Sequence, residues 1–137
     1  MWGRDTFISF RGEFLISGLI KEAKEIILMF ASSLRNGLIP NLYDKLNRPR
    51  YNCRDACWWF IKAIMDYIDF TKDESILGVS VELKFVDDSQ FDHFWKREKG
   101  EHKFMKLVDI VQTIFEVCSK QKINIVFLID ACERDKL

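Results

Sequence analysis

Hydrophobic residues recur at helical spacing in the first third of the chain and predict two consecutive helices, over residues 6–18 and 19–35. The second segment places lysine and glutamate side chains opposite its apolar side, as a half-buried helix requires. Asp5 or Thr6 can cap the first helix, and residues 36–37 (Asn-Gly) supply a stop for the second. The predicted inner faces are Phe7, Phe10, Phe14 and Leu15 in the first helix and Ala23, Ile26, Ile27, Phe30, Ala31 and Leu34 in the second.

Two further helices are predicted later in the chain by the same spacing. One runs from residue 55 to residue 67 or 70, and the other covers residues 103–120. Each has enough apolar residues on one side to pack against a core. Their predicted inner faces are Ala56, Trp59, Phe60, Ala63, Ile64 and Tyr67, and then Phe104, Leu107, Val108, Val111, Ile114, Phe115 and Cys118.

The segments between these helices have weaker patterns. Residues 38–42 cannot be helical throughout, because Pro40 lacks an N–H donor and disfavours a helical residue before it. Residues 43–52 are typical of a polar, basic loop. Alternating positions over 79–85 favour a short strand, and residues 123–129 form a β-branched run that fits either a strand or a buried helix. The pattern predicts an all-α architecture whose loops hold the polar and aromatic clusters.

The composition narrows the function classes. At 137 residues the chain has the length of one domain or of part of a larger one. Its 21 basic and 21 acidic residues cancel, which leaves no surplus to neutralise nucleic-acid phosphates. Four cysteines without a Cys-x-x-Cys pair, and two histidines, do not meet zinc spacing, so we predict no metal and no cofactor. Without a signal peptide or a membrane-spanning run, a cytoplasmic protein without membrane contact is expected.

Two short clusters contain the residues best suited to ligand binding, residues 2–8 (WGRDTFI) and residues 50–59 (RYNCRDACWW). Each sets an Arg-Asp pair beside tryptophan at the start of a predicted helix. Carboxylates accept hydrogen bonds from hydroxyls, guanidinium groups donate in a planar fork, and indoles cover apolar faces. A sugar ring has an apolar face and a rim of hydroxyls, so both clusters favour carbohydrate binding.

The residues alone leave three alternatives for the two aspartates. Asp5 and Asp55 are candidates for the acid–base pair of a glycoside hydrolase, whose carboxyl groups lie about 5–9.5 Å apart. An adjacent arginine lowers a carboxyl pKa, however, and a general acid needs a raised one, which favours ionised acceptors that orient a sugar. The third alternative is a pair of helix caps with surface ion pairs.

The neighbouring residues Trp58 and Trp59 point about 100° apart if they are helical. Either one of them faces a pocket and the other the core, or both are core residues. The sequence does not decide between these two arrangements.

Three motifs in this order, residues 2–8, residues 37–42 (GLIPNL) and residues 50–59, closely resemble the C-terminal amylo-α-1,6-glucosidase domain of eukaryotic glycogen debranching enzymes. The similarity extends from residue 2 to about residue 67. It implies an all-α, partial (α/α)6 toroid with a pocket formed by loops at one end, to which the patterns above add short strand segments in the C-terminal half. It also implies hydrolysis of the α-1,6-linked glucose at glycogen branch points, with glycogen or a branched α-glucan as the partner.

The resemblance also implies substrate-binding positions, motif by motif. The catalytic acid of the family lies in a Thr-Trp-Met-Asp motif with the base further downstream, and this chain has no such motif. We therefore expect no catalytic residue in this chain and no glucosidase activity from the chain alone. The implied positions are Trp2, Arg4 and Asp5 as floor and wall of a glucose subsite, Tyr51, Asn52, Arg54 and Asp55 as a second wall, Trp58 as a nearby aromatic, and Asn41 on the intervening loop.

The sequence thus predicts a single incomplete amylo-α-1,6-glucosidase-like helical domain over residues 1–137, well matched over 1–70 and divergent over 71–137. The missing remainder of the glucosidase domain is then a further partner, and helix faces without that partner are expected to associate. Two alternatives stay open. One is a non-catalytic helical carbohydrate-binding or scaffold remnant, and the other is a small helical protein of unrelated function.

Overall fold

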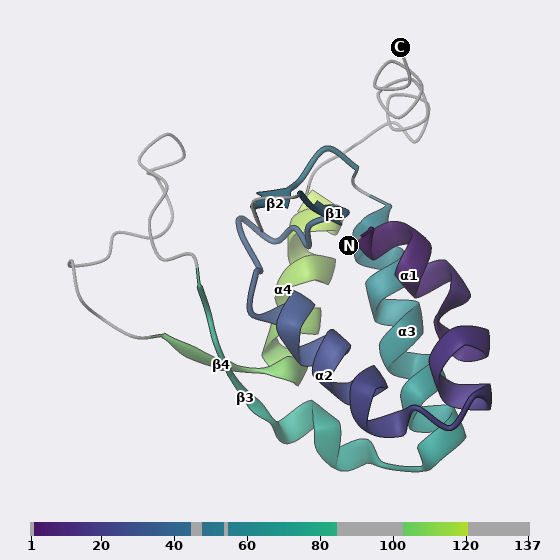
Figure 1. Cartoon of the computed structure of the whole chain (residues 1–137). Helices are drawn as coiled ribbons and strands as arrows, with labels where there is room; N and C mark the ends of the chain where they lie inside the picture. Colours follow the sequence, from purple (N-terminus) through teal and green to yellow (C-terminus); the bar gives the residue numbers. More distant parts are fainter. Residues whose placement is uncertain (1, 45–47, 54, 85–102, 121–137) are drawn as a thin grey trace.

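The computed structural model describes residues 2–44, 48–53, 55–84 and 103–120, and helices dominate these ranges (Figure 1). A π-helix, η1 (Arg11–Ile16), continues the first α-helix, and a 3-10 helix, η2 (Glu74–Gly78), follows the third. The mostly helical fold predicted from the sequence is confirmed, while the run at 123–129 lies outside the described residues. The α-helices are α1 (Gly3–Phe10), α2 (Ile20–Ala31), α3 (Ala56–Thr71) and α4 (Leu107–Lys120).

Two short antiparallel ribbons accompany these helices. β1 (Leu42–Tyr43) pairs with β2 (Pro49–Arg50), and β3 (Ser80–Glu82) pairs with β4 (Phe104–Lys106). The strand predicted within residues 79–85 is confirmed by β3. The prediction of a plain loop after Leu42 is wrong, because β1 and β2 are there; each has two residues, which is too short for alternation to reveal.

A cluster of phenylalanines joins the first three helices. Phe7 of α1 contacts Phe30 of α2 and Phe60 of α3 edge to face, with ring centroids 4.8 and 5.4 Å apart. All three side chains are fully buried. Such aromatic pairs add about 0.5–1.5 kcal/mol each beyond the area they bury. The apolar faces predicted for these helices point into this core, with their partly buried members at its edge.

The first helix starts earlier than predicted and uses no side-chain cap. Trp2 is the N-cap residue, and the predicted caps Asp5 and Thr6 do not take that place. Instead, the first two N–H groups of α1 donate to the carbonyl of Asn41, at 2.7 and 3.3 Å. A helix start needs partners for its first N–H groups, and here the backbone of a later loop provides them.

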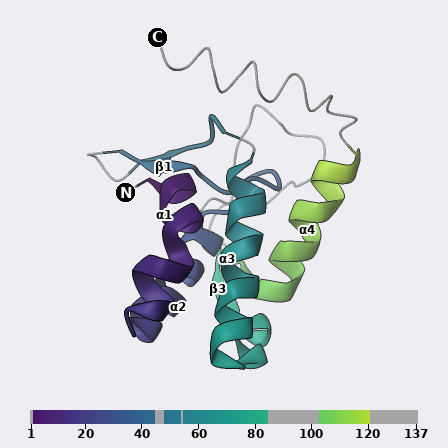
Figure 2. The same ribbon diagram turned by 90° about the vertical axis from the view of Figure 1, so that its right-hand side faces the viewer.

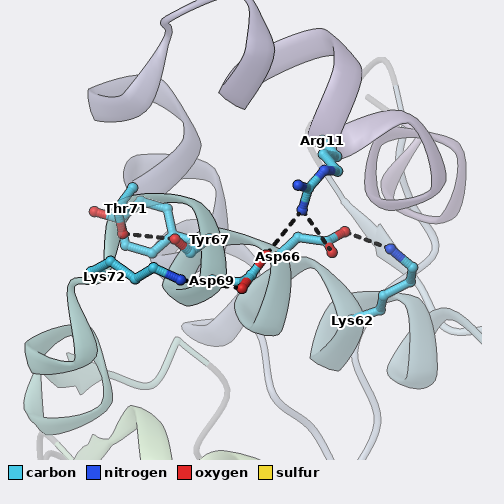
Figure 3. Close-up of polar contacts among 7 residues, drawn as sticks. All are labelled: Arg11, Lys62, Asp66, Tyr67, Asp69, Thr71 and Lys72. Atoms are coloured by element: carbon cyan, nitrogen blue, oxygen red, sulfur yellow. Dashed lines mark hydrogen bonds and ion pairs between the residues drawn. The ribbon is translucent and has the colours of Figure 1, made fainter.

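Charged side chains hold η1 against α3 (Figure 3). Arg11 Nη1 lies 3.4 Å from Asp69 Oδ2 and 3.8 Å from Asp66 Oδ1. Lys62 Nζ is 2.5 Å from Asp66 Oδ2, and Lys72 Nζ is 3.4 Å from Asp69 Oδ1. Exposed pairs contribute at most about 1 kcal/mol each, so this network orients η1 more than it stabilises the fold.

Two helices are shorter than their periodic patterns. α2 ends at Ala31, and the chain then reverses through residues with positive φ, Asn36 at 51° and Gly37 at 74°. α4 begins at Leu107, because the residues before it pair with β3 as strand β4. The prediction of a helix from residue 103 is therefore wrong at its first turn, where pairing with a distant strand outweighs local helical spacing.

The inner face of α4 also differs from the predicted one. Leu107, Ile110 and Ile114 are fully buried, whereas Val108 and Phe115 are each 44% exposed. Phe104, predicted on the same face, is exposed on β4. α4 packs against α2 and η2 through this narrow stripe, which leaves an apolar flank uncovered among the described residues.

The arrangement of the elements gathers several chain segments at one end of the molecule. In Figures 1 and 2 the start of α1, the ribbon of β1 and β2, and the start of α3 lie at the same end of the helices. α1 packs directly on α3. Among the helices in the described ranges, none has the length and apolar character needed to span a bilayer.

Candidate functional site

The ribbon of β1 and β2 brings the three sequence motifs together. A bridge between Trp2 and Leu42 ties the first motif to the chain that follows Pro40. The backbone N–H of Asn41 donates to the carbonyl of Arg50 at 2.9 Å, which ties the same segment to the third motif. Segments far apart in sequence therefore meet where α1 and α3 begin (Figure 2).

An ion pair connects the first and third motifs through their side chains. Arg4 Nε donates to Asp55 Oδ2 at 2.8 Å, and the two side chains are 40% and 34% exposed. The pair runs between the motifs and not within either Arg-Asp dipeptide. Neighbouring side chains on a helix point about 100° apart, so Arg4 turns away from Asp5 and toward the start of α3.

Asp55 receives further hydrogen bonds from its own motif. Cys53 Sγ donates to Asp55 Oδ1 at 2.6 Å, and the side chain of Trp59 also donates to this carboxylate. Burial raises the pKa of Asp55, but the bonds from Cys53, Arg4 and Trp59 and the charge of Arg4 together hold that pKa below its usual 3.8. An ionised carboxylate at neutral pH suits a hydrogen-bond acceptor and not a general acid.

The two neighbouring tryptophans point to different surroundings. Trp59 packs partly buried against the core. Trp58 is 44% exposed and meets Phe115 of α4 edge to face, with ring centroids 5.5 Å apart. Trp2 is 58% exposed at the start of α1. The alternative of two core tryptophans is therefore wrong, and exposed indoles lie at the starts of both α1 and α3.

The side chain of Tyr51 is used within the protein. Its hydroxyl donates to the carbonyl of Ser33 at 2.5 Å, and the Arg35 guanidinium lies 5.9 Å from the ring centroid. Burial raises the pKa of Tyr51 well above 10.0; nearby Tyr43 raises it further and Arg35 opposes the rise. The proton of the Tyr51 hydroxyl is therefore committed to the Ser33 carbonyl.

The remaining predicted positions differ in accessibility. Asp5 and Asn52 are exposed. Asn41 is 7% exposed, and its Oδ1 has no hydrogen-bond partner in the part of the chain that the structure describes. Arg54 lies outside the described residues. Within the described residues, direct contacts join Trp2, Arg4, Asn41 and Asp55 to one another or to their motifs, and the backbone N–H of Trp58 donates to the carbonyl of Asp55 at 3.0 Å.

Neither Asp5 nor Asp55 caps a helix with its side chain. Asp55 is the N-cap residue of α3, yet its side chain makes no capping bond. Side-chain capping is therefore wrong for both Asp5 and Asp55, whereas the ion-pair part of that alternative holds for Asp55. Over the described ranges, no cluster of three or more His, Cys, Asp or Glu side chains could hold a metal ion.

Two partners of Asp55 were not predicted, Cys53 and Trp59. Each lies within four residues of the carboxylate, and a donor that close in sequence can reach it at the start of a helix. This spacing was visible in the third motif. The sequence predicts no site role for Cys53, because a buried free cysteine most often behaves as a small apolar side chain.

Comparisons with known proteins identify the family to which the sequence belongs. The family model described as amylo-alpha-1,6-glucosidase matches residues 1–130. Over 90 residues, 64% of this chain, the sequence is 51% identical to the glycogen debranching enzyme of Saccharomyces cerevisiae (strain ATCC 204508 / S288c). That alignment covers 6% of the yeast protein, so the chain spans a small part of this relative's length. The predicted resemblance is confirmed: the chain belongs to the amylo-alpha-1,6-glucosidase family.

Proposed function

We propose that the starts of α1 and α3 form part of the glucose-binding subsite of a debranching glucosidase domain of the (α/α)6 toroid type. The domain would hydrolyse the α-1,6-linked glucose at glycogen branch points, in the cytoplasm. The observation that supports this most directly is the contact between Arg4 Nε and Asp55 Oδ2 at 2.8 Å. It joins two motifs that each contain an exposed tryptophan, Trp2 in one and Trp58 in the other.

The chemistry of these groups suits a neutral sugar. The Asp55 carboxylate stays ionised and accepts hydrogen bonds from hydroxyls, and the partly exposed Arg4 is a guanidinium donor beside it. Indole faces stack on the C–H face of a pyranose. Asp5, exposed in the first turn of α1, adds an acceptor near the positive end of that helix. These groups would orient the sugar and thereby position its reacting carbon.

Tyr51, Asn52 and Arg54 complete the proposed second wall, and Asn41 supports it from behind because its side chain is buried. No Thr-Trp-Met-Asp motif occurs in the sequence. We therefore assign positioning roles to this chain and place both catalytic carboxylates in the remainder of the domain. The isolated chain should bind branched glucan without cleaving it.

Co-sedimentation with glycogen tests the proposed subsite. The wild-type chain should pellet with glycogen, and the double variant Trp2→Ala/Asp5→Ala should pellet several-fold less. A matched control is Ile16→Ala/Asp109→Ala, which also removes an exposed apolar side chain and a first-turn carboxylate, but on η1 and α4 outside the motifs. Equal pelleting of the two double variants would contradict the proposed location.

The alternative of a non-catalytic carbohydrate-binding or scaffold protein rests on the same exposed aromatic residues. A branched limit dextrin separates binding from catalysis, because free glucose forms only if the α-1,6 bond is hydrolysed. We expect no glucose from this chain. Release of glucose would overturn the assignment of both catalytic groups to other parts of the domain.

A further inference from the structure

The carboxylate of Asp55 is held on both of its oxygens. Arg4 Nε donates to Oδ2 at 2.8 Å, and Cys53 Sγ donates to Oδ1 at 2.6 Å. The two donors come from different elements, since Arg4 lies in α1 and Cys53 in the segment between β2 and α3. Hydrogen bonds to both oxygens fix the plane of the carboxylate. A single ion pair between half-exposed side chains would leave that plane free to rotate.

Cys53 and Asp55 differ sharply in their exposure to solvent. Cys53 is 8% exposed, whereas the side chain of Asp55 is 34% exposed. The thiol therefore approaches the carboxylate from the protein side and leaves the outer side open. An ionised carboxylate has about four acceptor positions. Arg4, Cys53 and Trp59 account for three donors within the described residues, which leaves acceptor capacity for a ligand.

We propose that Cys53 is a positioning residue: its buried thiol fixes the orientation of the Asp55 carboxylate, so that the outward acceptor position meets a hydroxyl of the bound sugar. This inference rests on the proposed function for the identity of the ligand, but the thiol–carboxylate contact does not. The lowered pKa of Asp55 agrees with the contact, because donors to the charged form stabilise that form.

The second cysteine of the motif provides a matched control. Cys57 is fully buried in α3, accepts a hydrogen bond from the backbone N–H of Ile39 at 3.3 Å and lies 3.9 Å from the carbonyl of Gly37. Truncation of Cys57 removes a thiol that is buried to a similar extent. This thiol contacts the backbone of Ile39 and Gly37, whereas the thiol of Cys53 contacts Asp55. A difference between the two cysteine variants therefore reports on the carboxylate and not on loss of packing.

The test compares Cys53→Ala, Cys53→Ser and Cys57→Ala in the full chain. The first readout is the pKa of Asp55, which is measured by carbon-13 NMR of its carboxyl group. Cys53→Ala should raise this pKa, Cys53→Ser should restore it because the hydroxyl still donates, and Cys57→Ala should leave it unchanged. A pKa that does not move in Cys53→Ala, or rises equally in Cys57→Ala, would overturn the proposal.

A second measurement covers the case in which Cys53→Ala does not fold. The infrared S–H stretching band of Cys53, isolated in a background lacking the other cysteines, should shift in Asp55→Asn because the thiol loses its charged acceptor. An unshifted band would count against the proposal. Glycogen pelleting is then measured on the folded variants. It should fall a few-fold in Cys53→Ala and recover in Cys53→Ser, and pelleting unaffected by the loss of the thiol would refute the positioning role.

The two proposals fail in different ways. If wild type does not pellet with glycogen, the carbohydrate function is wrong, while the pKa and infrared readouts still decide whether Cys53 holds Asp55. If wild type binds glycogen and the pKa of Asp55 is unchanged in Cys53→Ala, the proposed subsite still stands and the positioning role of Cys53 is wrong.

Discussion

At the scale of single residues, burial and hydrogen bonding act on the pKa of Asp55 in opposite directions. Burial raises it, and the donors Cys53, Arg4 and Trp59 lower it below 3.8. Because the folded pKa lies below the unfolded one, the interaction contributes stability above the unfolded value and loses it as pH falls through the folded value. Asp55 is thus a source of acid sensitivity in this fold.

Asp55→Asn should therefore lower the free energy of unfolding at neutral pH and matter less in acid. The expected loss is up to about 1 kcal/mol, the range for partly exposed ion pairs. Urea titrations of dilute protein at neutral pH and at a pH well below 3.8 measure the effect. The lowered pKa values of Asp69 and Asp73 contribute equally to both proteins and cancel. An equal loss of unfolding free energy at the two pH values would mean that ionisation of Asp55 does not contribute to stability.

Tyr51 provides a second test at the same scale, because its hydroxyl donates to the Ser33 carbonyl at 2.5 Å. Tyr51→Phe keeps the ring and removes this bond. The free energy of unfolding should fall by about 1 kcal/mol, the usual net value of a hydrogen bond, while glycogen pelleting stays near wild type. Thermal unfolding and co-sedimentation test the two expectations. A large loss of binding in a stable variant would show that the hydroxyl meets the ligand.

The sequence predicted that the two Arg-Asp motifs lie close together, but it did not predict which arginine pairs with which aspartate. Arg4 and Asp5 are adjacent, as are Arg54 and Asp55, so adjacency suggested pairs within each motif. Consecutive side chains on a helix diverge by about 100°, and the observed partner of Arg4 comes from the other motif. Choosing among such pairs requires the separation of α1 and α3, which a pattern in one segment does not contain.

At the scale of elements, local periodicity predicted the buried faces of α1, α2 and α3 well, the buried face of α4 only in part, and the ends of the elements poorly. Phe7, Phe30 and Phe60 occupy the core as expected. The start of α1 and the strand β4 were missed for the same reason. Both depend on backbone partners distant in sequence, Asn41 for the helix start and β3 for the strand. Side-chain spacing reports which face is buried, and carries little information about where backbone groups find partners.

The turn between α2 and β1 offers a test of one such long-range contact. Gly37 has φ of 74°, and a Cβ placed there would overlap the side chain of Val117 in α4. Gly37→Ala should therefore strain the backbone and push α4 away, with a loss of about 1–3 kcal/mol in the free energy of unfolding.

Gly12→Ala is the matched control for this substitution. Gly12 lies in η1, and a Cβ added there would meet no described atom within 4 Å beyond its chain neighbours and the backbone of its own helix. Alanine favours helical backbone over glycine by about 1 kcal/mol, so this variant should be neutral or more stable. Chemical denaturation of both proteins decides the matter. Equal effects of the two substitutions would mean that neither the positive φ of Gly37 nor its contact with α4 constrains the turn.

At the scale of the whole molecule, the fold buries one core and leaves an apolar surface across α3 and α4. Trp58 and Phe115 meet edge to face at 5.5 Å, and each is 44% exposed. Val108, seven residues before Phe115 and on the same side of α4, is also 44% exposed. Met65 stands in the same relation to Trp58 on α3 and is 64% exposed. Exposed apolar side chains on two helices that meet in this way are typical of an interaction surface.

We expect the chain to associate through this surface when it is alone in solution. Burial of apolar area is favourable by about 25 cal/mol per Å², so a second copy that covers these side chains gains free energy. Sedimentation velocity should show a weight-average coefficient that rises with concentration. The double variant Val108→Ser/Phe115→Ser should weaken that rise, whereas Ile16→Ser, which removes an even more exposed apolar residue on η1, should leave it unchanged. One concentration-independent species with a sharp, reversible melt would show that the surface is tolerated by the monomer, and the expectation of association would then be wrong.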